Sequence, residues 1–218
     1  FIGYADMARE SVPPGNPVAR DVEQILKAGH RAKDLVQHIL AFSRQAATEP
    51  VTLYPALIVK EVIKMLRPSL PSTIAIEQRI DSKAGPVHID PTQLHQILMN
   101  LCTNAYHAME ETGGTLTLAL TTRQLDAEKA SRQPQAQAGP YVQLTVADTG
   151  CGIAPEVLER IFDPFFTTKE TGKGTGMGLS ILHGIVTSNG GFITLDSVPG
   201  QGSMFRVHLP VATPVPVA

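Results

Sequence analysis

Cysteine is scarce in this chain, which has two cysteines, Cys102 and Cys151, among its 218 residues. The two are not spaced like metal ligands, and they fall in a predicted helix and in a glycine-rich loop. Two separate thiols of this kind are typical of a protein kept in a reducing compartment.

Long apolar runs and a surplus of one charge sign are missing as well. The longest apolar runs are far too short to cross a bilayer, so we expect neither a signal peptide nor membrane contact within this chain. The 18 basic and 20 acidic side chains leave a formal net charge of −2. A nucleic-acid-binding domain normally has a basic face, and this balance therefore argues against a nucleic-acid partner.

Two common nucleotide-binding patterns are also absent. The chain has no GxxxxGK(S/T) loop, and no strand leads directly into a dinucleotide-binding glycine motif. It does have glycines at alternate positions from 172 to 178, directly before an apolar helix that starts at Leu179. Glycines before a helix let the backbone approach a phosphate group, to which the helix N-terminus offers N–H groups. Taken alone, such a loop is equally typical of a flexible surface turn.

Asp148 follows a predicted strand over residues 141–147 and begins the segment Asp-Thr-Gly-Cys-Gly. Val142, Leu144 and Val146 precede it at intervals of two, so its carboxylate is expected on the side where apolar residues pack. A carboxylate there is costly unless it accepts hydrogen bonds, and an exocyclic amine such as adenine N6 can donate one. An isolated Asp-Thr-Gly is more often a turn or a helix cap, so the interpretation depends on the rest of the chain.

Residues 1–46 are expected to be helical, with a break at Pro13-Pro14-Gly15. After the break, apolar residues alternate at steps of three and four, the pattern of a coiled-coil or helical-bundle seam. These residues are Ile25, Ala28, Ala32, Leu35, Ile39 and Phe42. We expect an antiparallel helical hairpin that lacks most of its first helix, with a dimer partner covering the seam. The chain starts with Phe rather than Met, which suggests a fragment of a longer protein.

An α+β pattern follows Glu49-Pro50, with a helix predicted over residues 56–66 and a strand over 73–80. Asp90-Pro91 is typical of the start of a second helix. The apolar stripe of this helix comprises Leu94, Ile97, Leu98, Leu101, Ala105 and Ala108. A second stripe at the same period is polar and comprises Gln93, Gln96, Asn100, Asn104 and His107. Such a stripe is ordinarily a solvated face, but asparagine is a mediocre helix former and its amide oxygen is a good Mg²⁺ ligand.

The remaining elements complete one α+β domain over residues 51–210. A strand is predicted over residues 115–120, a loose surface loop over 121–140 and a helix over 179–189. Two paired strands are predicted over residues 192–197 and 203–209. Residues 1–48 form the partial hairpin in this interpretation, and residues 211–218 are a linker or tail.

Four segments occur together and in order: Asn100-Leu-Cys-Thr-Asn104-Ala, Asp148-Thr-Gly-Cys-Gly-Ile153, Phe162-Asp-Pro-Phe-Phe166 and Gly172-Lys-Gly-Thr-Gly-Met-Gly-Leu179. They resemble the N, G1, F and G2 boxes of sensor histidine kinases, which belong to the Bergerat-fold ATPases together with gyrase, MutL and the heat-shock chaperone ATPases. The resemblance covers about residues 51–210 and implies a two-layer α/β sandwich, a mixed sheet with helices on one face. Residues 1–48 resemble the dimerisation and histidine-phosphotransfer hairpin of the same family.

The resemblance implies a role for each matching residue. Asp148 would accept a hydrogen bond from adenine N6, and Asn104, helped by Asn100, would hold Mg²⁺ and serve in catalysis. The other residues implied to contact ATP are Gly150, Gly152, Ile153, Phe162, Gly174, Thr175, Gly176, Met177, Gly178, Leu179 and Ser203. Lys169 and Lys173, in a mobile lid over residues 154–176, and His107 are further candidates for phosphate contact.

Two departures from the family pattern bear on the reaction. Asn100 stands where the hydrolytic members carry a glutamate base, and an amide cannot take a proton from water at neutral pH. The acceptor histidine of the family would precede Phe1, and His30 and His38 do not match its motif. The resemblance therefore implies a protein-histidine kinase region that uses ATP and Mg²⁺ but cannot label itself.

The same resemblance implies the partners: a homodimer through the hairpin and a response-regulator receiver domain, in the cytoplasmic part of a longer bacterial sensor. Two other function classes stay open on the sequence. A hydrolytic ATP-driven clamp of the gyrase or MutL kind is disfavoured by Asn100 and by the hairpin before the ATPase domain. An interaction module that has lost nucleotide binding is disfavoured by Asp148, Asn104 and the glycines.

Overall fold

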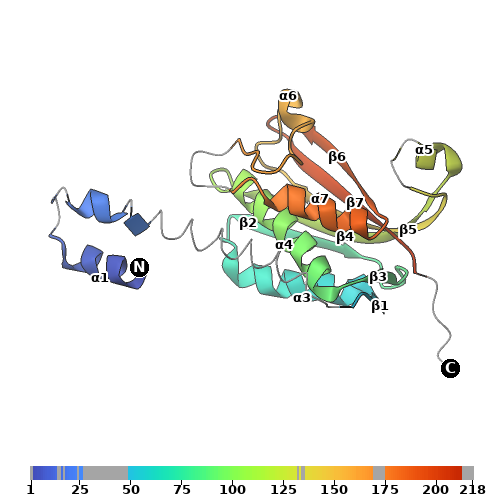
Figure 1. The fold of residues 1–218 in the computed structure, drawn as a ribbon, viewed down its shortest axis with the longest axis horizontal. Coiled ribbons are helices and arrows are strands. Elements are labelled where there is room, and N and C mark those ends of the chain that lie inside the picture. Colours follow the sequence, from blue (N-terminus) through green and yellow to red (C-terminus); the bar gives the residue numbers. More distant parts are fainter. Residues whose placement is uncertain are drawn as a thin grey trace. The chain divides into compact units, whose positions relative to one another are not determined.

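The structure is a computed structural model that describes residues 2–13, 16, 18–23, 25, 26, 49–131, 133, 136–168 and 175–212. The chain forms two compact units. The smaller comprises Phe1–Ala47 and Asp163–Gly178, and the larger comprises Thr48–Phe162 and Leu179–Ala218. Figure 1 follows the chain by colour, from blue at the N-terminus to red at the C-terminus.

The smaller unit begins with helix α1, Ile2–Ser11. The helix ends shortly before Pro13, at the break that the prolines predict, and residues 18–23 are helical again. Ala5 of α1 is buried together with Val22 and Leu26 of the second helical segment. A short apolar contact therefore joins the two segments.

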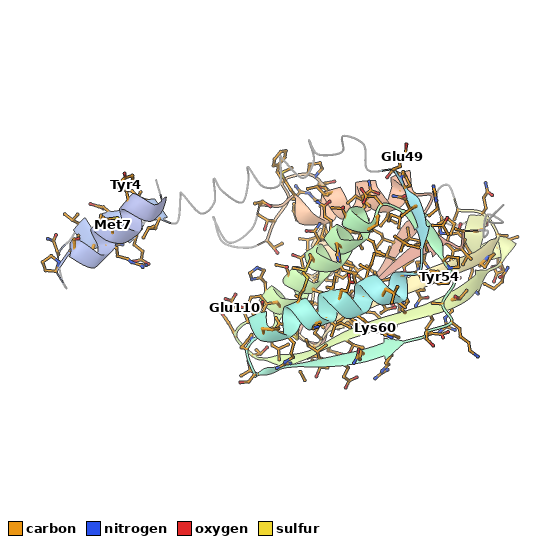
Figure 2. The ribbon with its side chains drawn as sticks, turned by 90° about the horizontal axis from the view of Figure 1, so that it is seen from below. Tyr4, Met7, Glu49, Tyr54, Lys60 and Glu110 are labelled. Atoms are coloured by element: carbon orange, nitrogen blue, oxygen red, sulfur yellow. The ribbon has the colours of Figure 1, made fainter. Side chains whose placement is uncertain are left out.

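Of the residues predicted to form the seam, the structure describes only the first, Ile25. Ile25 is 55% exposed, while its neighbour Leu26 is buried. Tyr4 and Met7, labelled in Figure 2, are exposed on α1. The other seam residues, Ala28, Ala32, Leu35, Ile39 and Phe42, lie outside the described residues, as do His30 and His38.

The larger unit is built on a five-stranded sheet in the order β2-β4-β5-β7-β6. Strands β2 and β4 run parallel, and the other neighbouring pairs run antiparallel. The strands are β2 Ile74–Ile80, β4 Gly114–Leu125, β5 Gly139–Asp148, β6 Phe192–Val198 and β7 Gly202–Pro210. A small antiparallel pair, β1 Val51–Leu53 and β3 Val87–Ile89, joins the end of β7 through a bridge between Val87 and Val211.

Three helices cover one face of the sheet, as Figure 1 shows: α3 Pro55–Leu66, α4 Pro91–Ala108 and α7 Gly178–Ser188. Shorter helical turns are η1 Arg67–Ser69, α5 Ala127–Ser131 and α6 Pro155–Leu158. Leu98 of α4, Leu118 of β4 and Leu182 of α7 are fully buried between the two layers. The predicted two-layer sandwich, with a mixed sheet and helices on one face, is confirmed.

Helix α4 follows its sequence signals closely. The Asp90 side chain accepts a hydrogen bond of 2.7 Å from the backbone N–H of Thr92 and so caps the helix, and Pro91 occupies the first turn. The predicted apolar stripe is buried from Leu94 to Ala105. The helix is therefore fixed in both register and rotation, which decides where its polar stripe lies.

The prediction of a loose loop over residues 121–140 is wrong. Strand β4 continues to Leu125, which pairs with Gly139 at the start of β5, and α5 lies in the connection. The hairpin extends because residues 121–125 keep forming ladder hydrogen bonds with residues 139–143. Its polar composition hid this, because three of these five residues are exposed.

His208 of β7 is part of an aromatic cluster. Its ring stacks on that of Phe192 at 4.3 Å between centroids, and Phe192 meets Tyr141 edge-on at 5.5 Å. The Nε2 atom of His208 lies 3.3 Å from the hydroxyl oxygen of Thr194. Burial, together with the positive charge of Arg206, lowers the pKa of His208 to about 4.

This lowered pKa predicts an acid-sensitive fold. Below pH 6.5 the unfolded chain takes up a proton on this histidine that the folded chain accepts only near pH 4. The contribution of this histidine to stability is therefore complete above pH 6.5 and is lost as the pH drops toward 4. Because the ring keeps some solvent contact, we expect a loss of roughly 1–2 kcal/mol, less than full linkage gives. Urea unfolding at pH 7.5 and 4.5 should show this loss in the wild type and in His88→Gln, and a smaller loss in His208→Gln.

Candidate functional site

Asp148 occupies the last position of β5, and its side chain is 8% exposed. Val142, Leu144 and Val146, which share its side of the strand, are each at most 2% exposed. The predicted orientation of the carboxylate, on the side where the apolar residues pack, is therefore confirmed.

Backbone N–H groups hold this carboxylate. Its Oδ1 atom accepts a hydrogen bond of 2.9 Å from Gly150, and the backbone N–H of Ser203 also favours its charged form. Burial nevertheless raises the pKa of Asp148 above its usual value, because it outweighs both hydrogen bonds. The charged carboxylate is thus incompletely compensated, and one more donor would stabilise it.

The loop after Asp148 is attached to the backbone on two sides. The N–H of Cys151 donates to the carbonyl oxygen of Ala108, at the end of α4, over 3.1 Å. The carbonyl oxygen of Cys151 accepts from Gly200, in the turn between β6 and β7, over 2.8 Å. The last turn of α4 therefore lies directly against this loop.

The two glycines of this loop are required by those close approaches. A Cβ atom on Gly150 would lie 2.4 Å from the Ala108 carbonyl oxygen, and one on Gly152 would lie 2.2 Å from the Val198 carbonyl oxygen. Gly152 also has a φ of 69°, which disfavours a side chain. Both predicted site glycines thus have a packing role, whatever they contact in a ligand.

Ser203 lies directly opposite Asp148 in the β5–β7 pair and is 6% exposed. The backbone N–H of Ile153 donates over 2.8 Å to Ser197, whose hydroxyl oxygen lies 3.0 Å from that of Ser203. Sequence reasoning missed Ser197. The predicted strand pair would have revealed it, because its register places Ser197 opposite Ser203.

The polar stripe of α4 is not an ordinary solvated face. All five of its side chains are half-buried, although Thr103 on the same helix is exposed. The side-chain amide of Asn189 donates a hydrogen bond of 3.0 Å to the Gln93 side chain, so Asn189, at the end of α7, contacts the N-terminal end of the stripe. At the other end, His107 lies 3.5 Å from Glu110, which Figure 2 labels.

Within the part of the chain that the structure describes, two amides of this stripe, those of Gln96 and Asn104, make no hydrogen bond, although both residues are half-buried. Ala108, one turn after Asn104 along the helix, holds the loop that follows Asp148. An amide in this position is suited to a ligand that approaches the same edge of α4.

The predicted lid divides between the two units. Phe162 of the larger unit is half-buried, and its ring centroid lies 5.2 Å from that of His183 on α7. In the smaller unit, Phe165 is 70% exposed and has a φ of 66°. A Cβ atom on Gly176 would lie 2.4 Å from the carbonyl carbon of Phe165. The backbone at Gly176 therefore contacts the backbone at Phe165.

The glycine-rich stretch is described only at its end. Thr175, Gly176 and Met177 are half-buried, and α7 begins at Gly178, with Leu179 half-buried in its first turn. The N–H of Met177 donates to the Thr175 hydroxyl over 3.4 Å. Lys169, Lys173 and Gly174 lie outside the described residues.

Two further properties concern the described residues as a set. They contain no group of three or more histidine, cysteine, aspartate or glutamate side chains that could hold a metal ion. None of their helices is both long and apolar enough to span a membrane.

Comparison with known proteins adds independent evidence. Residues 89–213, more than half of the chain, match the family described as histidine kinase-, DNA gyrase B-, and HSP90-like ATPase. The sensor kinase CckA of Brucella abortus is 42% identical over 96% of this chain and 22% of its own length. The two-component sensor PprA of Pseudomonas aeruginosa is 38% identical over 84% of this chain and 19% of its own length. The chain thus spans about a fifth of these relatives.

Solved structures show the same fold. The full-length kinase ShkA, in complex with AMPPNP, superposes with a TM-score of 0.66 at 26% identity over 98% of this chain and 43% of its own. The catalytic domain of the histidine kinase ThkA superposes with a TM-score of 0.60 at 26% identity over 75% of this chain and 97% of its own. Taken with the buried Asp148 and the ordered sequence boxes, these matches mean that the chain belongs to the histidine kinase-, DNA gyrase B- and HSP90-like ATPase family, as the ATPase domain of a sensor histidine kinase.

Proposed function

We propose that ATP binds with its adenine amine on Asp148 and its phosphates toward α4 and the start of α7. The observation that carries this proposal is the Asp148 carboxylate, which is buried and incompletely compensated at the end of β5. An N6 amine would donate a further hydrogen bond to this carboxylate, and Ser203 lies opposite Asp148 in the β5–β7 pair. Gly150, Gly152 and Ile153 would lie beside the adenine with their backbone.

Mg²⁺ fits the donor set of α4. Mg²⁺ prefers oxygen ligands and keeps several waters, so an amide oxygen and the phosphates of ATP suffice to bind it. Asn104 would hold the ion, with Asn100 one turn before it on the same face. When bound, the ion supplies neutralisation of phosphate charge. His107 and the lid lysines Lys169 and Lys173 are candidates for direct phosphate contact.

The reaction that follows is phosphoryl transfer rather than hydrolysis. Asn100 has no basic atom with which to deprotonate a water molecule. Transfer instead needs an oriented acceptor, here a histidine on the dimerisation helix, from which the phosphate passes to an aspartate of a response regulator. The crystal structure of ThkA is a complex with the response regulator TrrA, and it shares the fold of this chain with a TM-score of 0.67 at 23% identity. We expect a homodimer through residues 1–48, and Ile25, which is exposed, offers an apolar side chain to such a partner.

Titration of residues 1–218 with ATP, with and without Mg²⁺, tests the binding site. We expect ATP to bind in both cases and more tightly with Mg²⁺, whereas adenosine should be indifferent to the ion. If ATP does not bind, or if Mg²⁺ leaves its affinity unchanged, the proposed use of α4 is wrong.

Asn104→Ala should weaken Mg²⁺-ATP binding about tenfold or more, because it removes a metal ligand. Adenosine binding should stay unchanged, since adenosine carries no phosphate. The helix itself should not suffer, because alanine is the better helix former and the apolar stripe lies on another face. Calorimetry with both ligands measures the difference, and Thr103→Ala, one residue earlier and exposed, is the control. Equal losses for both ligands would indicate damage to the helix instead.

A further inference from the structure

The Ser197 hydroxyl connects three parts of the site that are distant in the sequence. It accepts a hydrogen bond of 2.8 Å from the backbone N–H of Ile153, in the loop after Asp148. It donates to the carbonyl oxygen of Gly202 over 3.1 Å and lies 3.0 Å from the hydroxyl oxygen of Ser203. All these groups belong to the larger unit.

The hydrogen-bonding capacity of a hydroxyl group fixes the direction of the Ser197–Ser203 bond. A serine hydroxyl has one hydrogen and two lone pairs. The hydrogen of Ser197 goes to Gly202, because a carbonyl oxygen can only accept. One lone pair is taken by Ile153. The other lone pair remains for Ser203, so Ser203 must be the donor in the bond between the two hydroxyls.

This direction determines what Ser203 presents to a ligand. With its hydrogen committed to Ser197, the Ser203 hydroxyl offers only lone pairs to its other neighbours. Asp148, directly opposite in the β5–β7 pair, also offers acceptors. The site therefore places two acceptors side by side. An exocyclic amine has two hydrogens and suits such a pair, whereas a carbonyl oxygen at the same place of the base meets acceptors alone and is rejected.

We propose that Ser197 is a specificity-determining positioning residue, which makes Ser203 an obligate acceptor and thereby selects adenine over 6-oxopurines. The proposal rests on the binding of ATP at Asp148. Ser197 acts through Ser203 and through Ile153, and it has no need to touch the nucleotide. Removal of its hydroxyl frees the hydrogen of Ser203, which can then turn toward the base and donate to a carbonyl oxygen.

The test compares ATP with inosine triphosphate, which carries a carbonyl oxygen in place of the amine. In Ser197→Ala we expect the preference for ATP to shrink about tenfold, through weaker ATP binding and stronger inosine triphosphate binding. The ratio of the two affinities is the decisive quantity, because partial unfolding would reduce both affinities equally. Ser197→Thr keeps a hydroxyl at this position and should retain the wild-type preference for ATP.

Two further variants isolate the mechanism. Ser188→Ala removes another hydroxyl that donates to a backbone carbonyl, that of Ile185 over 2.9 Å, and should leave the ratio unchanged. In a Ser203→Ala background, Ser197→Ala should have no further effect on the ratio, because the hydroxyl that it directs is gone.

The possible outcomes separate the role of Ser197, the bond between the two hydroxyls and the ATP site itself. An unchanged ratio in Ser197→Ala, with ATP binding still dependent on Asp148, overturns the role of Ser197 and leaves the binding site intact. A ratio that shifts equally with and without Ser203 overturns the hydroxyl relay. If instead Asp148→Asn leaves ATP affinity unchanged, the proposed site itself is wrong.

Discussion

Asp148→Asn should weaken ATP binding about tenfold to a hundredfold without weakening the fold. The amide replaces one acceptor oxygen by an NH₂ group, which opposes either the ligand amine or the backbone donors of Gly150 and Ser203. Loss of a charge-assisted hydrogen bond in a buried site costs roughly 1.5–3 kcal/mol, which corresponds to this range. Calorimetric titration with ATP measures the change.

The raised pKa of Asp148 separates this effect from misfolding. A carboxyl group with a higher pKa in the folded chain than in the unfolded one destabilises the fold at neutral pH, and the loss sets in as the pH rises through these two values. The neutral amide removes this penalty. Thermal unfolding at pH 7 should therefore show Asp148→Asn to be at least as stable as the wild type, while its ATP affinity is lower.

The chain offers a matched control. Asp81 accepts a hydrogen bond of 2.8 Å from the backbone N–H of Lys83, two residues on, as Asp148 does from Gly150, but it is exposed. Asp81→Asn should leave ATP affinity unchanged. Equal ATP affinity for wild type and Asp148→Asn would show that adenine binds elsewhere.

The fold was predictable where several local signals agree along the chain. Helix α4 has a cap at Asp90, Pro91 in its first turn and an apolar period of 3.6, and the structure has this helix over Pro91–Ala108. The hairpin of β4 and β5 escaped prediction because its outer half is polar. Residues 121–125 are strand because they pair with residues 139–143, and pairing partners cannot be identified from one segment.

Part of the site was also predictable from a local pattern. The alternation of apolar residues before Asp148 sufficed to place its carboxylate, since a strand has a period of two. The packing role of Gly150 and Gly152 was not predictable, because the carbonyl groups that exclude a Cβ there come from Ala108 and Val198, far away in the sequence. Ser197 was missed because the strand pair was predicted without its register, and it is the register that places Ser197 opposite Ser203.

A second prediction with a large expected effect concerns phosphoryl transfer from ATP. We expect residues 1–218 to bind Mg²⁺-ATP, to hydrolyse it far more slowly than about 1 s⁻¹, and to acquire no label from γ-phosphate-labelled ATP. Phosphoryl transfer depends mainly on positioning and charge stabilisation, so a site that binds ATP tightly stays idle without an oriented acceptor. Asn100 cannot activate water in its place.

Extension of the chain at its N-terminus by the first helix of the family hairpin, with its histidine, should restore an acid-labile phosphohistidine. The change is from no label to stoichiometric label, which is the largest effect predicted for this protein. The same extension with that histidine replaced by alanine is the control and should stay unlabelled. The labelled chain should then transfer its phosphate to an aspartate of a receiver domain, which a chase with unlabelled regulator would show as loss of label.

The possible results separate the three function classes. Brisk ATP turnover by residues 1–218 would favour a hydrolytic clamp, because a clamp needs water rather than a histidine as acceptor. Label on His30 or His38 would show that the acceptor lies within residues 1–218 after all. A chain that binds no ATP would be an interaction module, yet it would keep the energetic cost of a buried, incompletely compensated Asp148 with no ligand to offset it. That cost is one physical reason to expect a nucleotide here, and without an oriented acceptor histidine we expect this nucleotide to persist unreacted.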